Sequence, residues 1–417
     1  MSIMKRKTIY IIGAGSTAGL GIPTSNAQLN LFENLAGNDN ETLCQLYHIV
    51  SERFKDKKYG INDVFNLIDT ALYLKTGLYV NKEGKEQKIE YTGLLQTKRE
   101  LIAHIFEHFQ DKIGRMDDRV YEKYIDFYYQ LAKGELSKKI ECDVDMQARE
   151  FFIADYSIIN FNWDLCSLFP IIEANKKLNH ENDRYINREG LPQLRMYTDF
   201  NYECASLMND VPWFPFTEPA AAVSNSDKHN GKRRVVLLKT FYPHGLMNSF
   251  KCPKCARHSL YLGKQLKIKD ACQSIDYNKN EPLYKCMSCG TEISAKDFNV
   301  LVQSNFKERN SFLEETCIKM FCELESAEKL VFIGYSMPQD DIDYRTFFKS
   351  LNNVKEVYVV LYDKNSHNFK QISDDDNLSN YLDETKTAIG NYLSVFKHVY
   401  LNTKGFPDAV NDILRIQ

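Results

Sequence analysis

The sequence predicts an α/β protein built on a doubly wound parallel β-sheet, and three observations carry the prediction. An apolar run over residues 7–12 breaks on Gly13-Ala14-Gly15, as a buried strand does when it leads into a phosphate-binding turn. Further apolar runs follow, mostly separated by helical patterns or insertions. Two Cys-x-x-Cys pairs with 30 residues between them indicate a separate metal-binding module. The six expected strands are 7–12, 156–161, 234–239, 329–333, 356–362 and 398–401.

The turn after the first run has the composition of a nucleotide site. Gly13 permits a tight turn, and Gly15 lets the backbone approach a pyrophosphate without an intervening Cβ. Ala18 occupies the third small-residue position of the dinucleotide fingerprint. An ordinary glycine turn has the same pattern, so the Rossmann-like interpretation depends on the rest of the chain.

Composition excludes few partners. The chain has 417 residues, enough for one large domain with insertions or for two to three units. Its 53 basic and 56 acidic side chains nearly balance, so no direct nucleic-acid binding is expected. No apolar signal core precedes the first strand, and no later run approaches the length of a membrane span. We therefore expect a cytoplasmic protein without membrane contact, in which the cysteines outside the two pairs are reduced.

The remaining segments divide the chain into four parts. Apolar residues at three- and four-residue spacing over 62–69 and 101–106 predict a helical insertion. Residues from 179 onward have several prolines and no clear periodicity, which indicates an irregular lid or partner surface. The division assigns 1–24, 151–250 and 295–417 to a discontinuous Rossmann-like domain, 25–150 to the helical insertion, 179–232 to an irregular insertion within the Rossmann-like part, and 251–294 to a zinc ribbon.

Polar residues follow three of the expected strands. Asn162 and Asp164 end the second strand, His244 follows the third, and Gly334 begins a turn that continues to Ser336. The carboxyl ends of parallel strands face the ligand crevice of an open α/β sheet. Two structural interpretations stay open, because Asn162 and Asp164 are good helix caps and His244 could simply end a strand.

The cysteine pairs predict a structural zinc site. Four thiolates can supply the tetrahedral ligands of Zn²⁺, and a site closed by four protein ligands leaves no position for catalysis. A redox dithiol would need only one pair, and reduced cysteines without metal are the other alternative. The expected ligands are Cys252, Cys255, Cys286 and Cys289.

Taken together, these motifs resemble the sirtuin (Sir2) family. The stretch from Gly13 to Pro23 aligns without a gap on the family's nucleotide loop, and Asn162-Trp163-Asp164 is similar to its Thr-Gln-Asn-x-Asp turn. His244-Gly245, the four-cysteine ribbon and Gly334-Tyr335-Ser336 then follow in the family's order. The resemblance covers the sheet and the ribbon, and the two insertions fall outside it.

The resemblance implies that NAD⁺ binds between sheet and ribbon and that the bond joining nicotinamide to ribose is cleaved. It implies that Asn162 positions the ribose or the attacking water, that His244 is the general base, and that Asp164 holds the nicotinamide amide or orients the loop. The remaining contacts to NAD⁺ that it implies come from Gly13, Ala14, Gly15, Thr17, Gly21, Ile22 and Pro23 for the pyrophosphate loop and from Gly334 and Ser336 for the adenosine half.

Two departures from the family's pattern favour water as the acceptor. Thr24-Ser25 stands where deacylating sirtuins usually have Phe-Arg, and Phe161 replaces the Gln before Asn162. The chain thereby resembles prokaryotic Sir2-like NAD⁺ hydrolases of anti-phage defence, which deplete NAD⁺ when triggered. That branch implies a homo-oligomer and a separately encoded partner, such as a HerA-type ATPase or a prokaryotic Argonaute. A protein-lysine deacylase or ADP-ribosyltransferase, and a non-catalytic NAD or ADP-ribose sensor, are the alternatives.

Overall fold

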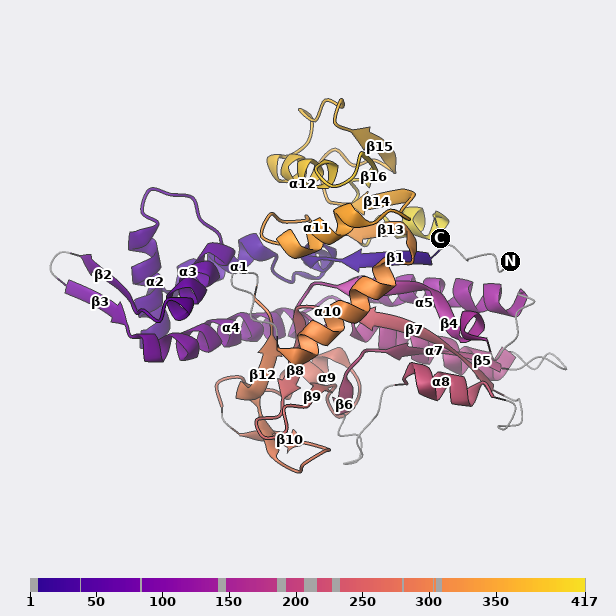
Figure 1. Ribbon diagram of the computed structural model, residues 1–417, viewed down its shortest axis with the longest axis horizontal. Coiled ribbons are helices and arrows are strands. Elements are labelled where there is room, and N and C mark those ends of the chain that lie inside the picture. Colours follow the sequence, from indigo (N-terminus) through magenta and orange to yellow (C-terminus); the bar gives the residue numbers. More distant parts are fainter. Residues whose placement is uncertain are drawn as a thin grey trace.

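An eight-stranded sheet forms the centre of the computed structural model (Figure 1), in the order β15-β16-β14-β13-β1-β4-β7-β5. The structure describes residues 7–37, 39–82, 85–141, 148–185, 193–205, 216–226, 233–279, 281–302, 304 and 310–416. The strands are β1 (Lys7–Ile12), β4 (Ile153–Asn160), β5 (Gln193–Asp199), β7 (Arg233–Phe241), β13 (Ala327–Ile333), β14 (Glu356–Val360), β15 (Lys370–Ser373) and β16 (His398–Asn402).

The predicted fold class is confirmed by the pairing of these strands. β1 lies between β4 and β13 and is parallel to both, with Ile9 opposite Ser157 and Leu330. All six expected strands belong to the sheet, and β15 adds an antiparallel edge beside β16. A parallel sheet covered on both faces needs continuously apolar strands, which explains why the runs were visible in the sequence.

Helices cover both faces of the sheet, and side chains alternate between two cores. Tyr10 and Ile12 point into the core beneath α5 (Asp118–Glu141), α7 (Phe169–Tyr185) and α13 (Val410–Arg415). Ile9 and Ile11 point into the opposite core, which holds residues of α10 (Ser311–Leu324), α11 (Ile342–Ser350) and α12 (Asp383–Leu393). The two-residue period of a strand therefore sends successive β1 side chains to opposite layers.

The insertion after the first loop is mainly helical, as expected. Its helices α1 to α4 and a β-hairpin form a lobe beside one end of the sheet (Figure 1). The long helix α5 instead packs on the sheet, where the rings of Phe127 and Tyr10 lie 6.2 Å apart. The α-helices and strands between β1 and β4 are α1 (Ser25–Glu33), α2 (Glu41–Arg53), α3 (Ile61–Tyr73), β2 (Leu78–Lys82), β3 (Lys85–Ile89), α4 (Tyr91–Gly114), α5 and α6 (Arg149–Phe152).

The prediction of an irregular segment over 179–232 is wrong for its described parts. β5 pairs in parallel with β7 along its whole length, β6 (Glu203–Ala205) joins another sheet, and α8 (Glu218–Ser224) follows. β5 was missed because its apolar residues, Leu194 and Met196, alternate with polar ones and form no continuous apolar run. Residues 186–192, 206–215 and 227–232 of this segment lie outside the described residues.

The cysteine-bearing module continues directly from the sheet. A four-stranded sheet in the order β12-β8-β9-β6 and the hairpin β10-β11 make up its strands, below the main sheet in Figure 1. Its elements are β8 (Gly245–Lys251), β9 (His258–Tyr261), α9 (Ile268–Gln273), β10 (Pro282–Lys285), β11 (Glu292–Ser294) and β12 (Phe298–Val300). Among the described helices of the chain, none is both long and apolar enough to cross a membrane.

Candidate functional site

The glycine loop after β1 has no helix at its end. It forms two short 3₁₀ turns, Ala14–Ser16 and Ala18–Leu20, and α1 begins only at Ser25. Gly21 ends the second turn in a left-handed conformation (φ +79°), and Pro23 disfavours helical geometry at the residue before it.

Gly13 and Gly15 are needed for contact between two loops. A Cβ on Gly13 would lie 2.4 Å from the Cα of Tyr335, and one on Gly15 would lie 2.9 Å from the carbonyl oxygen of Gly334. The amide of Gly15 donates to that same oxygen over 2.8 Å. The missing Cβ atoms thus admit the turn after β13.

Asn162 is fixed against the glycine loop. It is 5% exposed, and its Nδ2 donates to the carbonyl oxygen of Gly13 over 3.1 Å. Its backbone amide donates to Oδ1 of Asn160, the last residue of β4, over 3.0 Å. These bonds hold the Asn162 side chain at the carboxyl ends of β1 and β4.

Asp164 joins the same loop to the turn after β4. Its Oδ2 accepts a hydrogen bond from the hydroxyl of Thr17 over 3.1 Å, and its Oδ1 accepts from the amide of Cys166 over 2.8 Å. Burial raises the pKa of Asp164 to about 6, although both hydrogen bonds oppose the rise. Asp164 caps a turn before α7 and also orients the glycine loop.

His244 lies at the end of the neighbouring strand. Its side chain is buried, and Nδ1 lies 3.1 Å from the carbonyl oxygen of Phe161. A carbonyl oxygen only accepts, so Nδ1 donates and the neutral ring has its lone pair on Nε2. The structure thus brings His244 to the segment that carries Asn162.

Aromatic rings surround His244. Phe161 lies 5.1 Å from it and stacks on Tyr335 at 4.9 Å, while Tyr344 of α11 lies 5.6 Å from His244. The hydroxyl of Tyr335 donates to Oδ2 of Asp341 over 2.7 Å. We call Phe161, Tyr335 and Tyr344 the aromatic cluster. The sequence did not predict that Tyr344 lies beside His244, because the residues around Tyr344 on α11 form no recognisable motif.

The helical insertion also contributes to the site. The hydroxyl of Tyr124 on α5 donates to the carbonyl oxygen of Ser16 over 2.7 Å. The indole of Trp163 packs edge-on against Phe106 of α4, and Asn62 of α3 donates to Asp340 in the turn after β13. Tyr124, Phe106 and Asn62 were missed because the insertion lies outside the motifs and a helical period marks only its own core.

The other predicted binding residues flank these contacts. Gly21, Ile22 and Pro23 lie further along the glycine loop, with Ile22 and Pro23 buried and Gly21 exposed. Ala14 and Gly334 are partly exposed, and Ser336 is exposed.

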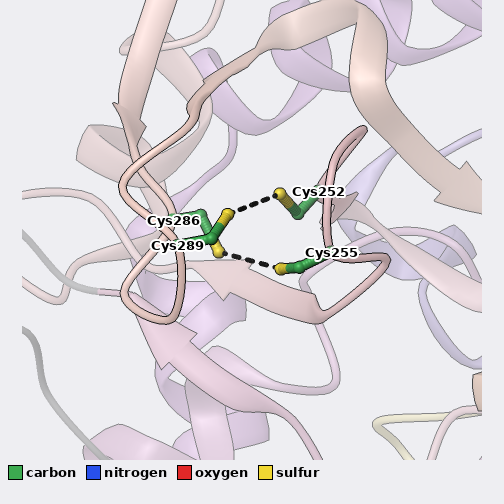
Figure 2. A group of neighbouring side chains, drawn as sticks. All are labelled: Cys252, Cys255, Cys286 and Cys289. Atoms are coloured by element: carbon green, nitrogen blue, oxygen red, sulfur yellow. Dashed lines mark hydrogen bonds between the residues drawn. The ribbon is translucent and has the colours of Figure 1, made fainter.

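The four predicted zinc ligands come together (Figure 2). Their sulfur atoms all lie within 4.8 Å of one another, and Sγ of Cys252 lies 3.5 Å from that of Cys289. Zn–S bonds of about 2.3 Å in a tetrahedron place sulfurs about 3.8 Å apart, so the cluster fits Zn²⁺. Its Cys255 and Cys286 sulfurs form the second close pair, also at 3.5 Å.

Comparison with known proteins gives structural likeness alone. No family model matches the chain, and no curated protein matches it. A Sir2 homolog–NAD complex is 11% identical with a TM-score of 0.37, over 100% of this chain and 91% of that one. A Sir2 homologue mutant–ADP ribose complex is 12% identical with a TM-score of 0.36, over 99% of this chain and 92% of that one. At this identity the likeness concerns the fold and not what this chain binds.

Proposed function

We propose that the protein is an NAD⁺ glycohydrolase that releases nicotinamide and ADP-ribose with water as the acceptor. One observation carries the proposal: the carboxyl ends of β1, β4 and β7 bring Asn162, Asp164 and His244 to one region, two of them bonded to the glycine loop. This is the edge at which open α/β sheets bind nucleotides. The resemblance of the motifs to sirtuins supplies the identity of the nucleotide.

The reaction needs a shielded cationic centre and one nucleophile. Cleavage passes through an oxocarbenium-like ribose, as in glycoside hydrolysis. Water oxygen bonds to the anomeric carbon, the carbon–nitrogen bond breaks, and its electron pair neutralises the departing nicotinamide ring. The water's proton goes to Nε2 of His244, whose lone pair the bond from Nδ1 to Phe161 orients.

The other site residues bind and position. Asn162 holds the ribose or the water, since its amide is already fixed to Gly13. Asp164 acts as a positioning residue, because both of its oxygens accept hydrogen bonds from the protein. In the proposed complex the pyrophosphate and adenosine halves of NAD⁺ lie along Gly13, Ala14, Gly15, Thr17, Gly21, Ile22, Pro23, Gly334 and Ser336.

The aromatic cluster favours water over a peptide. His244 is only 2% exposed, and Phe161 packs against it where deacylases have a glutamine. An acyl-lysine side chain would have to displace these rings to reach the site, whereas water would not. The deacylase alternative therefore requires a rearrangement that the hydrolase does not.

Zinc and the biological setting belong to the same proposal. Zn²⁺ bound by the four cysteines would be structural, since the ligand set is closed. The resemblance to defence hydrolases supports an effector that depletes NAD⁺ in phage-infected cells and stays inactive until triggered. A homo-oligomer and a HerA-type ATPase or Argonaute partner are the corresponding expectations.

Substitution of the two central residues tests the site. His244→Ala and Asn162→Ala should each reduce nicotinamide release by about 10²-fold or more, the range of a lost general base or positioning group. His398→Ala, at an exposed histidine on β16, is the matched control and should leave the rate unchanged. Circular dichroism checks that the variants fold, and a fully active Asn162→Ala enzyme would refute the assignment.

A further inference from the structure

A cavity of about 300 Å³ lies outside the proposed NAD⁺ site, between the cysteine module and α10. It lies next to β9 and the first turns of α10, and its volume is at the lower end of the range for small-ligand pockets. Its lining includes Arg257, His258, Ser311, Phe312, Glu315 and Lys319.

A chain of hydrogen bonds fixes the tautomer of His258. Oδ1 of Asn310 accepts from the amides of Phe312 and Leu313 as the cap of α10, so its Nδ2 must face Oδ1 of Asn299. Nδ2 of Asn299 then donates to Nδ1 of His258 over 3.0 Å. Because Nδ1 accepts, the proton of the neutral ring is on Nε2.

Nε2–H of His258 is a buried donor that makes no hydrogen bond within the described part of the chain. His258 is 6% exposed, and its Nε2 has no hydrogen-bond partner among the described residues. Phe312 stacks on the ring at 4.5 Å and holds its plane. Burial, together with Lys251, lowers the pKa of His258 to about 4, so the ring is neutral at pH 7. Buried polar groups are nearly always satisfied, which points to a ligand that accepts a hydrogen bond.

The charges around the cavity favour an anion. Arg257 lines it, and Lys251 lies directly across from His258 in the β8–β9 pair. Glu315 is the acidic residue of the lining, and its carboxylate is paired with Lys319 over 2.8 Å. Ser311 is the first residue of α10, whose positive dipole end adds to the field.

We propose that this cavity binds a small oxyanion, a carboxylate or a phosphate group, through Nε2–H of His258 and the guanidinium of Arg257. The anion completes the hydrogen bonding of the buried imidazole and lies at the N-terminus of α10. Its binding does not depend on the NAD⁺ site, because none of the residues proposed to contact NAD⁺ lines the cavity.

Nitrogen-15 NMR of the full chain with labelled histidine tests the proposal. The Nε2–H signal of His258, identified by its loss in His258→Gln, should shift saturably with inorganic phosphate, acetate or both. A shift with phosphate alone supports a phosphorylated ligand, and a shift with acetate supports a carboxylate. No saturable shift at about 10 mM of either anion, a concentration that saturates a 1 mM site, would overturn the proposal.

Two variants make the test specific. Arg257→Gln changes an exposed side chain and should weaken anion binding at least tenfold without unfolding the protein. His244→Ala should bind the anion as the unsubstituted chain does, even if NAD⁺ hydrolysis is lost. Unchanged anion affinity in Arg257→Gln would contradict the proposed site, whereas failure of NAD⁺ hydrolysis would leave it intact.

Discussion

At the scale of single residues, Gly334 shows how tightly the two loops of the site are joined. Its φ of +63° resembles that of Gly21 at +79°. The backbone strain of an alanine substitution should therefore be the same at both positions, about 1 kcal/mol. A Cβ on Gly334 would also lie 2.0 Å from the amide nitrogen of Ser16, whereas nothing lies within 4 Å of one on Gly21.

Gly334→Ala should therefore lower the free energy of unfolding by about 3 kcal/mol or more, and Gly21→Ala by about 1 kcal/mol. Urea denaturation of the two variants measures the difference. Equal losses would mean that the loops do not pack as closely as described.

At Asp164 we expect a conflict between stability and function, because its buried carboxylate lowers the stability of the fold and also orients the glycine loop. Its pKa rises from 3.8 to about 6 on folding, so the folded state holds the proton more tightly than the unfolded state. The carboxylate consequently costs stability as pH rises from 4 through 6, by up to about 3 kcal/mol above pH 7. Asp164→Asn cannot ionise.

The Asp164→Asn variant should be more stable than the unsubstituted chain at pH 8 and should lose that advantage as pH falls towards 4. Its NAD⁺ turnover should fall, because the glycine loop loses its orientation. Thermal unfolding at several pH values gives the profile. A stability difference that does not change with pH would show that the Asp164 carboxyl does not titrate as proposed.

At the scale of elements, length and burial decided what could be predicted. The six expected strands are apolar on both faces and stood out in the sequence. β5 and β15 lie at the edges and were missed, because an edge strand can be half polar and then forms no continuous apolar run. The close packing of the glycine loop against the turn after β13 could not be predicted, because a dinucleotide pattern does not distinguish loop packing from ligand contact.

The four-cysteine cluster is the element whose stability should depend on metal. Cys286→Ser removes a buried ligand and should abolish stoichiometric zinc and lower the melting temperature, because metal binding is coupled to the folding of the module. Cys322→Ser, at an exposed cysteine on α10, should do neither. Elemental analysis with calorimetry measures both, and a metal-free protein of full stability would refute the zinc site.

At the scale of the whole molecule, the sequence indicated which strand ends form the site but not what surrounds them. The sequence could place Asn162, Asp164 and His244 near one another because parallel strands present their carboxyl ends to one crevice. Tyr124, Phe106 and Asn62 meet the site from the helical insertion, and no local pattern reports such contacts between distant segments. The aromatic cluster likewise depends on α11 packing back against β4 and β7.

The most direct test of the central claim is the fate of NAD⁺ in ¹⁸O-labelled water. The purified chain, with and without an acetylated peptide, is incubated with NAD⁺, and nicotinamide and ADP-ribose are followed by mass spectrometry. We expect nicotinamide release without peptide and one ¹⁸O on the anomeric carbon of ADP-ribose. Nicotinamide release that strictly requires the peptide, with the acetyl group transferred to ADP-ribose, would contradict the hydrolase and establish a deacylase.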